Sequence, residues 1–242
     1  RKLKPKYVLY HGDTLTSSAA AISSKLAGCE GVHLEAGLRS GSIWEPFPEE
    51  ISRRICDTFS SLLFAVSDVT EKNLKKEHRK GKIVVVGNTI IDSIKICLDL
   101  TKKAKKIPSN YVVVNIHRHE NIKSVKRLEK IVQIIENVDE PIIWPIHDNT
   151  KQQLMKSNLW TQLQKRNITF GPLLPYTDFI ALLANCKYMI TDGGSIQEES
   201  LALKKPCILL RKTTERVEGL ATGLNFLTGL DLEKAKSAIS KA

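Results

Sequence analysis

Short apolar runs alternate with stretches of helical spacing along the whole chain. The apolar runs are nearly continuous and rich in β-branched residues, which is typical of parallel strands covered on both faces. They are Tyr7–Tyr10, Val32–Leu34, Leu62–Val66, Ile83–Val86, Val112–Ile116, Ile142–Ile146, Tyr188–Ile190 and Cys207–Leu210. The helical stretches between them are Ser17–Cys29, Glu49–Thr58, Thr70–Glu77, Ile90–Thr101, Ser124–Asn137, Thr150–Ser157, Asp178–Cys186 and Ile196–Lys204. This succession predicts an α/β fold with mostly parallel sheets and right-handed crossovers.

A Lys-rich segment with a proline, TKKAKKIPSN, follows the fourth helical stretch. Such a segment is typical of a linker, so we expect two Rossmann-like domains with a cleft between them. The expected N-terminal domain spans residues 1–95, and the expected C-terminal domain spans residues 96–242. Ligands of such sheets bind beyond the carboxyl ends of the strands, so functional residues are sought where strands run into loops.

The charge balance is basic, with 37 Lys and Arg against 26 Asp and Glu and a formal net charge of +11. The basic residues are spread over many segments, and the densest runs lack interleaved aromatic residues. A solvated surface is therefore favoured over a nucleic-acid partner, and a basic pocket for a small phosphorylated ligand is compatible with it.

The cysteine pattern and the apolar runs bear on location. Five cysteines stand at wide spacings with no CxxC pair, which indicates reduced thiols in a cytoplasm. No run approaches the ~18 apolar residues of a membrane span, and the N-terminal residues do not form a signal peptide. We therefore expect a cytoplasmic protein with no membrane partner.

Three carboxylates follow strands or open a helix in the first half. Asp13 follows the first strand, Glu35 ends the second, and Glu49 stands in the first turn of a helix. Asp13 could instead cap a helix, and Glu49 could serve the helix dipole or pair with Arg53. If the three converge, repulsion and burial raise the pKa of some of them toward neutrality, as general acid–base catalysis requires. Arg39, four residues after Glu35, suits a charged ligand.

Two further strand ends carry polar residues in the second half. His117, Arg118 and His119 follow the fifth strand, and His147 follows the sixth. Arg118 indicates contact with an anion. A zinc pair of His117 and His119 lacks a third ligand at a suitable spacing, so no metal is expected.

The turn after the seventh strand is the most specific segment. Gly193, Gly194 and Ser195 stand at the mouth of a helix that carries Glu199. A glycine-rich turn of this kind lets backbone N–H groups and the positive helix end approach a phosphate, although it is neither a P-loop nor GxGxxG. Glu199 could accept hydrogen bonds from ribose hydroxyls or only compensate the helix dipole. Arg216, in the charged loop after the last strand, again suits an anion.

Seven segments, in one order over nearly the whole chain, resemble the non-hydrolysing UDP-N-acetylglucosamine 2-epimerase family. They are HGDT (11–14), HLEAGLRSG (33–41), PFPEEISRR (46–54), GNTIID (87–92), HRHEN (117–121), TDGGSIQEES (191–200) and RKTTERVE (211–218). The resemblance implies a GT-B fold and a usually dimeric cytoplasmic enzyme of polysaccharide biosynthesis. Its implied reaction interconverts UDP-N-acetylglucosamine and UDP-N-acetylmannosamine by eliminating UDP to a 2-acetamidoglucal and adding it back, with no cofactor.

The resemblance also implies roles for individual residues. By similarity, the catalytic residues are Asp13, Glu35, Glu49 and His117. Arg53 and Arg216 match charged cleft positions, Gly193, Gly194 and Ser195 match the diphosphate cradle, and Glu199 matches the ribose contact. Arg39, Arg118 and His147 are added as expected substrate contacts because of their place at strand ends.

The sequence departs from the family pattern in three ways. It has TDGGS where members usually read TDSGG, and HRHEN where HRREN is commoner. Members also begin with about three further βα units and end in a longer helical tail, so we expect a shortened chain with an incomplete first domain. Two alternatives stay open: an impaired or truncated UDP-sugar-binding protein, and a GT-B glycosyltransferase.

Overall fold

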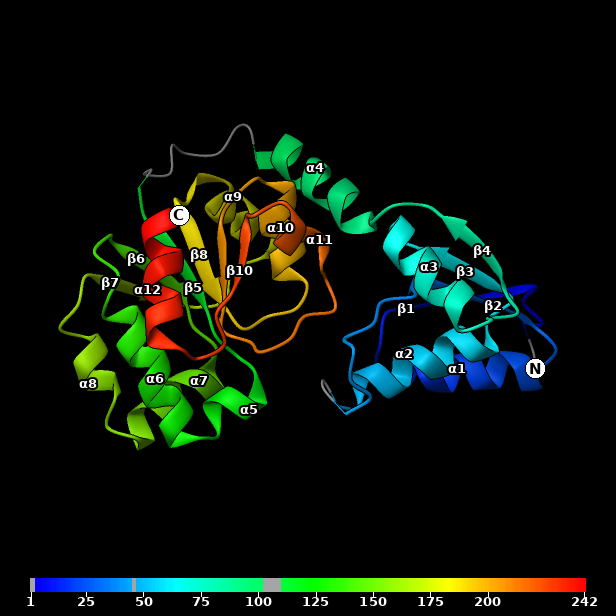
Figure 1. The fold of residues 1–242 in the computed structure, drawn as a ribbon, viewed down its shortest axis with the longest axis horizontal. Helices are drawn as coiled ribbons and strands as arrows, with labels where there is room; N and C mark the ends of the chain where they lie inside the picture. Colours follow the sequence, from blue (N-terminus) through cyan, green and yellow to red (C-terminus); the bar gives the residue numbers. More distant parts are fainter. Residues whose placement is uncertain (1–2, 45–46, 102–109) are drawn as a thin grey trace. The chain divides into compact units, whose positions relative to one another are not determined.

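The computed structural model describes residues 3–44, 47–101 and 110–242. The chain divides into two compact units, unit 1 over Arg1–Thr89 and unit 2 over Ile90–Ala242 (Figure 1). Each contains one parallel β-sheet with helices on its faces, which confirms the predicted α/β class. The expected boundary between residues 95 and 96 falls inside α4 (Thr89–Thr101), and residues 102–109 of the expected linker lie outside the described residues.

Unit 1 is built on a four-stranded parallel sheet whose strands follow one another in chain order. They are β1 (Tyr7–His11), β2 (Glu30–Ala36), β3 (Leu62–Ala65) and β4 (Lys82–Val85). The connecting helices are α1 (Leu15–Leu26), α2 (Glu49–Phe59) and α3 (Asp68–Lys76). Tyr10 packs with Ala21 of α1 and Cys56 of α2, while Leu74 of α3 packs with Leu63. Helices therefore cover both faces of this sheet.

Unit 2 has a six-stranded parallel sheet in the order β10-β9-β8-β5-β6-β7. The strands are β5 (Val112–Asn115), β6 (Ile142–Pro145), β7 (Ile168–Gly171), β8 (Tyr188–Thr191), β9 (Cys207–Leu209) and β10 (Asn225–Leu227). The sequence analysis did not predict β7 and β10. Neither segment, ITFG or NFL, contains a continuous apolar run long enough to be read as a strand from the sequence.

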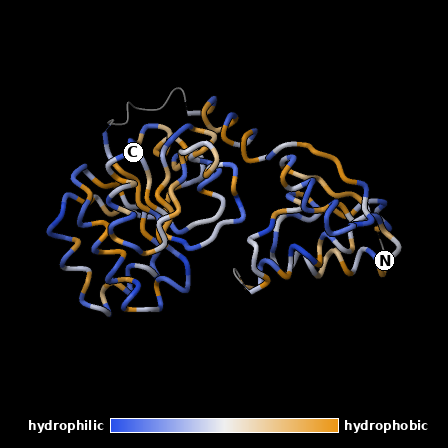
Figure 2. Tube along the Cα trace, viewed as in Figure 1, coloured by the Kyte–Doolittle hydropathy of each residue, from blue (hydrophilic) through white to orange (hydrophobic). Residues whose placement is uncertain are grey.

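Alternation along β5 divides the core of unit 2 into two layers. Val112 and Val114 face one layer, and Val113 faces the other. The first layer holds α6 (Val125–Ile135), α7 (Asp148–Lys156), α8 (Trp160–Leu163) and α12 (Leu232–Lys241), and the second holds α9 (Tyr176–Asn185) and α10 (Ile196–Ala202). The short helices α5 (His119–Ile122) and α11 (Glu218–Ala221) lie in loops. Figure 2 shows the hydrophobic strands of the sheet between these layers.

The strand order of unit 2 reverses once. From β5 the chain adds β6 and β7 on one side, and it then adds β8, β9 and β10 on the other. The order therefore reverses between β5 and β8, which pair in register from Val112 with Tyr188 to Asn115 with Thr191. Open α/β sheets bind ligands beyond the carboxyl ends of the strands at such a reversal.

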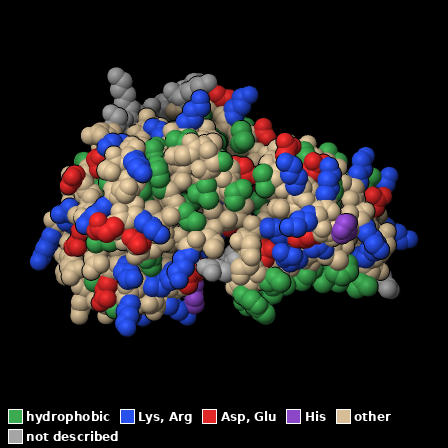
Figure 3. Space-filling model, viewed as in Figure 1, with side chains coloured by type: hydrophobic (Ala, Val, Ile, Leu, Met, Phe, Trp, Pro, Cys, Tyr) green, Lys and Arg blue, Asp and Glu red, His purple; other side chains and the backbone are tan. Residues whose placement is uncertain are grey.

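The surface matches the charge pattern expected from the sequence. Figure 3 shows Lys and Arg side chains spread over the visible faces of both units. Among the described residues, no helix is long and apolar enough to cross a membrane. All five cysteines are free thiols, and four of them are buried.

Candidate active site

Asp192 joins the loops after β5 and β8, where the strand order of unit 2 reverses. It stands at the carboxyl end of β8 and is fully buried. Its Oδ1 accepts a hydrogen bond from the backbone N–H of His117 at 3.0 Å, and its Oδ2 accepts from the N–H of Arg118 at 3.0 Å and from Asn121 Nδ2 at 2.8 Å. Three donors on one buried carboxylate fix the loop after β5 against the loop after β8. The sequence analysis assigned Asp192 no role, because its partners are about seventy residues away.

The structure brings His117 and His147 together from separate strand ends. Their rings lie with centroids 5.0 Å apart. His117 Nδ1 is 2.9 Å from Asn115 Oδ1, so it carries the proton that this contact needs, and Nε2 is left for other partners. Burial lowers the pKa of His147, and the charge of His117 lowers it further.

The glycine turn after β8 lies against His117 and against two arginines. A Cβ at Gly193 would lie 3.2 Å from His117 Cε1. A Cβ at Gly194 would lie 3.8 Å from Arg211 Nη1 and 3.9 Å from Arg118 Nη2. Two guanidinium groups therefore face the backbone of Gly194. Ser195 precedes α10 and makes no side-chain cap hydrogen bond.

Arg211 is the least expected member of the site. It follows β9, is only 6% exposed, and its Nη2 contacts Glu215 Oε2 at 3.0 Å. Its Nη1 has no hydrogen-bond partner in the part of the chain that the structure describes. A buried guanidinium with an unused donor beside a glycine backbone suits a bound anion. The sequence placed Arg211 in a charged loop, whereas it singled out Arg216 as the ligand residue.

Arg216 and Glu199 lie on facing segments of the same site. Arg216 forms an ion pair with Glu198, so its charge is already matched within the protein. Glu199 is buried, and burial raises its pKa against the opposing effects of a hydrogen bond from Tyr176 and the charge of Arg216. Tyr176, at the start of α9, was not predicted from the sequence. Its contact with Glu199 joins residues that are distant in the chain.

In unit 1, Asp13 and Glu35 stand at the adjacent carboxyl ends of β1 and β2. Glu35 has a left-handed φ of 67° where the β2–β3 register shifts. It contacts His11 Nε2 at 2.9 Å, and its Oε2 lies 3.9 Å from the Cβ position of Gly12. Left-handed backbone at a residue other than glycine costs about 1–3 kcal/mol and is concentrated at functional sites. The short distance to Gly12 shows that the Glu35 carboxylate lies beside the Gly12–Asp13 turn.

Asp13 forms an ion pair with Arg53, which is 3% exposed and also contacts Glu50 at 3.2 Å. The capping alternative for Asp13 is wrong, because Thr14 is the N-cap of α1 and accepts from the N–H of Ser17. The structure thus brings two of the predicted residues, Asp13 and Arg53, into direct contact.

The two glutamates at the start of α2 have different environments. Glu50 is fully buried and contacts Arg53, Arg54 at 3.1 Å and the N–H of Ser40 at 3.2 Å. Glu49 Oε2 is also buried, yet no hydrogen bond to it is found among residues 3–44, 47–101 and 110–242. Glu50 is therefore held by its ion pairs, whereas Glu49 Oε2 has no hydrogen bond from any described residue.

Arg39 does not take the ligand-facing place expected for it. Its Nη2 contacts Asp57 at 2.7 Å, and its Nε and Nη2 each donate to Glu77 at 2.7 Å. The hydrogen bond from Arg39 is the main cause that lowers the pKa of Glu77 to about 2. The sequence analysis missed this pairing because Asp57 and Glu77 lie far along the chain, and Arg39 stabilises unit 1 instead.

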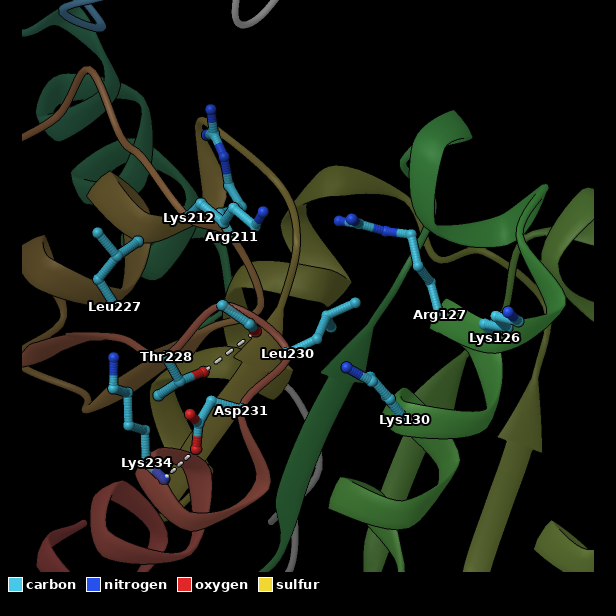
Figure 4. Close-up of a pocket in the computed structure, with 11 residues that line it drawn as sticks. Lys126, Arg127, Lys130, Arg211, Lys212, Leu227, Thr228, Leu230, Asp231 and Lys234 are labelled. Atoms are coloured by element: carbon cyan, nitrogen blue, oxygen red, sulfur yellow. Dashed lines mark hydrogen bonds between the residues drawn. The ribbon is translucent and has the colours of Figure 1, made fainter.

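A separate basic pocket of about 540 Å³ lies on unit 2 (Figure 4). Its only carboxylate among the described lining residues, Asp231, accepts from the N–H of Lys234 as the cap of α12. The basic residues that line it are Lys126, Arg127, Lys130, Arg211, Lys212 and Lys234. Part of the positive charge of the chain is therefore gathered beside the loop that carries Arg211. No group of three His, Cys, Asp or Glu side chains that could hold a metal ion occurs in the described ranges.

Comparison with known proteins identifies the family of the chain. The family model described as UDP-N-acetylglucosamine 2-epimerase matches residues 1–242. The chain belongs to the UDP-N-acetylglucosamine 2-epimerase family. UDP-N-acetylglucosamine 2-epimerase of Methanocaldococcus jannaschii is 38% identical over 98% of this chain, which covers 69% of that protein.

Solved structures of epimerases from this family have the same fold. The M. jannaschii enzyme in complex with UDP-GlcNAc and UDP matches with a TM-score of 0.90 and 37% identity, over 99% of this chain and 69% of that one. The Neisseria meningitidis epimerase bound to UDP-GlcNAc matches with a TM-score of 0.88 and 28% identity, over 99% of this chain and 68% of that one. The predicted family and the predicted GT-B type of fold are confirmed.

Proposed function

We propose that this chain interconverts UDP-N-acetylglucosamine and UDP-N-acetylmannosamine. A base removes the C2 proton, the C1–O bond to UDP breaks, and the C1=C2 bond of a 2-acetamidoglucal forms. UDP then adds back at C1 while an acid returns a proton to the opposite face of C2. The atoms balance without a cofactor, because the same proton equivalent and the same UDP leave and return.

Inversion at C2 requires proton-transfer groups on both faces of the sugar. Asp13, Glu35 and Glu49 are proposed for this work together with His117. Glu49 Oε2 is buried without a hydrogen bond from any described residue, and Glu35 has a left-handed backbone; both observations support the assignment. Arg53 is proposed to hold Asp13 in place through their ion pair.

One observation carries the proposal that unit 2 binds UDP. His117, Arg118, Arg211 and the turn at Gly193–Ser195 meet at the strand reversal, and Arg211 Nη1 is buried with no partner among the described residues. A departing diphosphate needs donors held in place before the reaction, since these stabilise the charge that develops on it. We propose that Glu199 accepts hydrogen bonds from the ribose hydroxyls. His147 and Arg216 are proposed to lie near the bound diphosphate.

Proton exchange at C2 tests the reaction. UDP-GlcNAc is incubated with the chain in deuterated water, and the C2–H signal is followed by proton NMR. We expect loss of that signal and appearance of UDP-ManNAc. UDP binding without exchange would favour the impaired binding protein, and sugar transfer to an acceptor without exchange would favour a glycosyltransferase.

We further propose a homodimer in the cytoplasm. Exposed apolar side chains on unit 1 support the dimer, among them Leu9, Leu15 and Leu26, and Figure 3 shows hydrophobic side chains over the side of unit 1 where α1 and α2 run. The free thiols of all five cysteines support a reducing compartment. Light scattering after size-exclusion chromatography tests the dimer, and a single-chain mass would contradict it.

A further inference from the structure

His33 lies beside the turn that carries Asp13, and it is not one of the predicted catalytic residues. It is in β2, two residues before Glu35, and its side chain is fully buried. Nδ1 lies 2.7 Å from Asp57 Oδ1, and Nε2 lies 2.9 Å from the carbonyl oxygen of Gly12. Both ring nitrogens are therefore used, one toward α2 and one toward the turn that carries Asp13.

The hydrogen positions follow from the partners. A backbone carbonyl can only accept a hydrogen bond, so Nε2 carries a proton and donates a hydrogen bond to the carbonyl of Gly12. Asp57 Oδ2 also accepts from Arg39 Nη2 at 2.7 Å, and Arg39 contacts Glu77 at its other side. Arg39 thus lies between the carboxylates of Asp57 and Glu77, and these ion pairs compensate the burial of the charged groups. His33 joins Asp57 to the Gly12 carbonyl.

The backbone N–H and the carbonyl of Gly12 both form hydrogen bonds that hold the Gly12–Asp13 turn. The N–H of Gly12 donates to the carbonyl of Leu34 at 3.1 Å, and its carbonyl accepts from His33. Gly12 has a left-handed φ of 69°, a conformation that is open to glycine. The residues on either side of Leu34 in β2, His33 and Glu35, therefore both lie against this turn.

The contacts between the Gly12–Asp13 turn, β2 and α2 form a closed ring. Asp13 is paired with Arg53 of α2, Asp57 stands four residues further along the same helix, and Asp57 binds His33. Since residues four apart share one face of a helix, Arg53 contacts Asp13 and Asp57 contacts His33 from the same face of α2. Movement of the Gly12 carbonyl would change the place of Asp13 relative to Glu35 and Arg53.

We propose that His33 is a positioning residue, which holds the Gly12–Asp13 turn through its Nε2–H so that the Asp13 and Glu35 carboxylates keep their spacing. Its effect on turnover rests on the proposed epimerase function. Its effect on the turn does not, and the two can be measured separately.

Two substitutions separate the two ring nitrogens. The amide of His33→Gln can replace Nε2 and reach Gly12, whereas the amide of His33→Asn can replace only Nδ1 and reach Asp57. We expect H33Q to retain kcat within about fivefold and H33N to lose about 100-fold in kcat with little change in KM. The kcat is expressed per folded molecule, with the folded fraction taken from circular dichroism.

Amide NMR of the labelled full chain gives a readout that does not need activity. We expect the Gly12 and Asp13 amide signals to move in H33N and to stay close to those of the wild type in H33Q. Equal kcat per folded molecule in both variants, or unmoved Gly12 and Asp13 signals in H33N, would overturn the proposal. If the wild-type chain shows no C2 exchange while these signals respond as expected, the proposed function fails and the positioning role stands. If H33N does not fold, unshifted Gly12 and Asp13 signals in Asp57→Asn, in which the His33 ring loses the carboxylate that orients it, would also overturn it.

Discussion

The imidazole ring of His147 lies against the ring of His117, with centroids 5.0 Å apart and planes inclined by 31°. Burial is the first cause that lowers the pKa of His147, and the charge of His117 adds to it, while Asp192 and Asp148 oppose it. The pair therefore favours the neutral state of His147 in the free protein. A bound diphosphate would favour the protonated state.

The first prediction is that UDP-GlcNAc binds more tightly as the pH falls. An anion beside His147 raises its pKa, so binding takes up a proton, and affinity should rise up to about tenfold between about pH 7.5 and about pH 6. Titration calorimetry in two buffers of different protonation enthalpy measures both the affinity and the proton uptake. UDP-GlcNAc suits the test because its diphosphate has no group that titrates in this range.

The matched variants are His147→Asn and His78→Asn, the latter at an exposed position of unit 1. H147N should flatten the pH dependence, and H78N should leave it unchanged. An equal slope in H147N and in the wild type would contradict the assignment of His147.

A second prediction concerns the space beside Gly194. A Cβ there would lie 3.4–3.9 Å from Glu215, Arg211 and Arg118, so Gly194→Ala fits without a clash but fills the space that faces the two guanidinium groups. We expect UDP affinity to fall about tenfold or more while the free energy of unfolding changes by less than about 0.5 kcal/mol. Urea unfolding and calorimetry measure the two quantities.

Gly171→Ala in β7 is the control for this substitution. Apart from its chain neighbours, no described residue has an atom within 4 Å of a Cβ at Gly171, so the change should alter neither affinity nor stability. Wild-type UDP affinity in G194A would show that the diphosphate does not lie at this turn.

The predictable part of the site is local in sequence, and the rest depends on distant pairs. His117, Arg118 and Gly193–Ser195 were found because each directly follows a β-branched run, and parallel strands align their carboxyl ends. Asp192 and Arg39 were misjudged because their partners come from other elements. The hydrogen bond from the His117 N–H to Asp192 spans 75 positions, and that from Arg39 to Glu77 spans 38. No periodicity in the sequence encodes such pairs.

The same reason explains the missed strands and the boundary. The segments of β7 and β10 contain few residues that favour a strand. These strands form because they can add to the two edges of a sheet already covered by helices. α4 was divided by the expected boundary, yet its Ile94 and Cys97 pack with Ile180 of α9. Packing with unit 2 therefore determines where that helix belongs, although its sequence adjoins unit 1.

A third prediction separates the ribose contact from the diphosphate contact. The hydroxyl of Tyr176 donates to Glu199 and lowers the pKa of that carboxyl, which burial raises. Tyr176→Phe should raise the Glu199 pKa further and weaken UDP binding about threefold to tenfold, with the larger loss at lower pH. Glu199→Gln should weaken UDP binding about tenfold or more, because a hydrogen bond to a charged acceptor is lost.

Inorganic pyrophosphate is the control ligand for these variants because it has no ribose. Its affinity should be the same in the wild type, Y176F and E199Q. Glu233→Gln, at an exposed residue of α12, should change neither ligand. Parallel losses of UDP and pyrophosphate in E199Q would place Glu199 at the diphosphate instead of the ribose.

The last prediction uses the two neighbouring glutamates of α2 as a matched pair. Glu50 is fully buried and contacts Arg53 and Arg54, so Glu50→Gln leaves Arg53 with less compensation and should cost about 3 kcal/mol in the free energy of unfolding. Glu49 Oε2 is buried with no partner among the described residues, so Glu49→Gln should leave stability within about 1 kcal/mol of the wild type. Its C2 exchange rate should nevertheless fall about 1,000-fold, since an amide can neither take nor return the proton. Urea unfolding and deuterium exchange are measured on the same preparations. E50Q should be the less stable variant, whereas E49Q should be the one that exchanges the C2 proton more slowly. An E49Q chain that exchanges the C2 proton at the wild-type rate would remove Glu49 from the chemistry, and the search for the second proton-transfer group would then turn to Asp13 and Glu35.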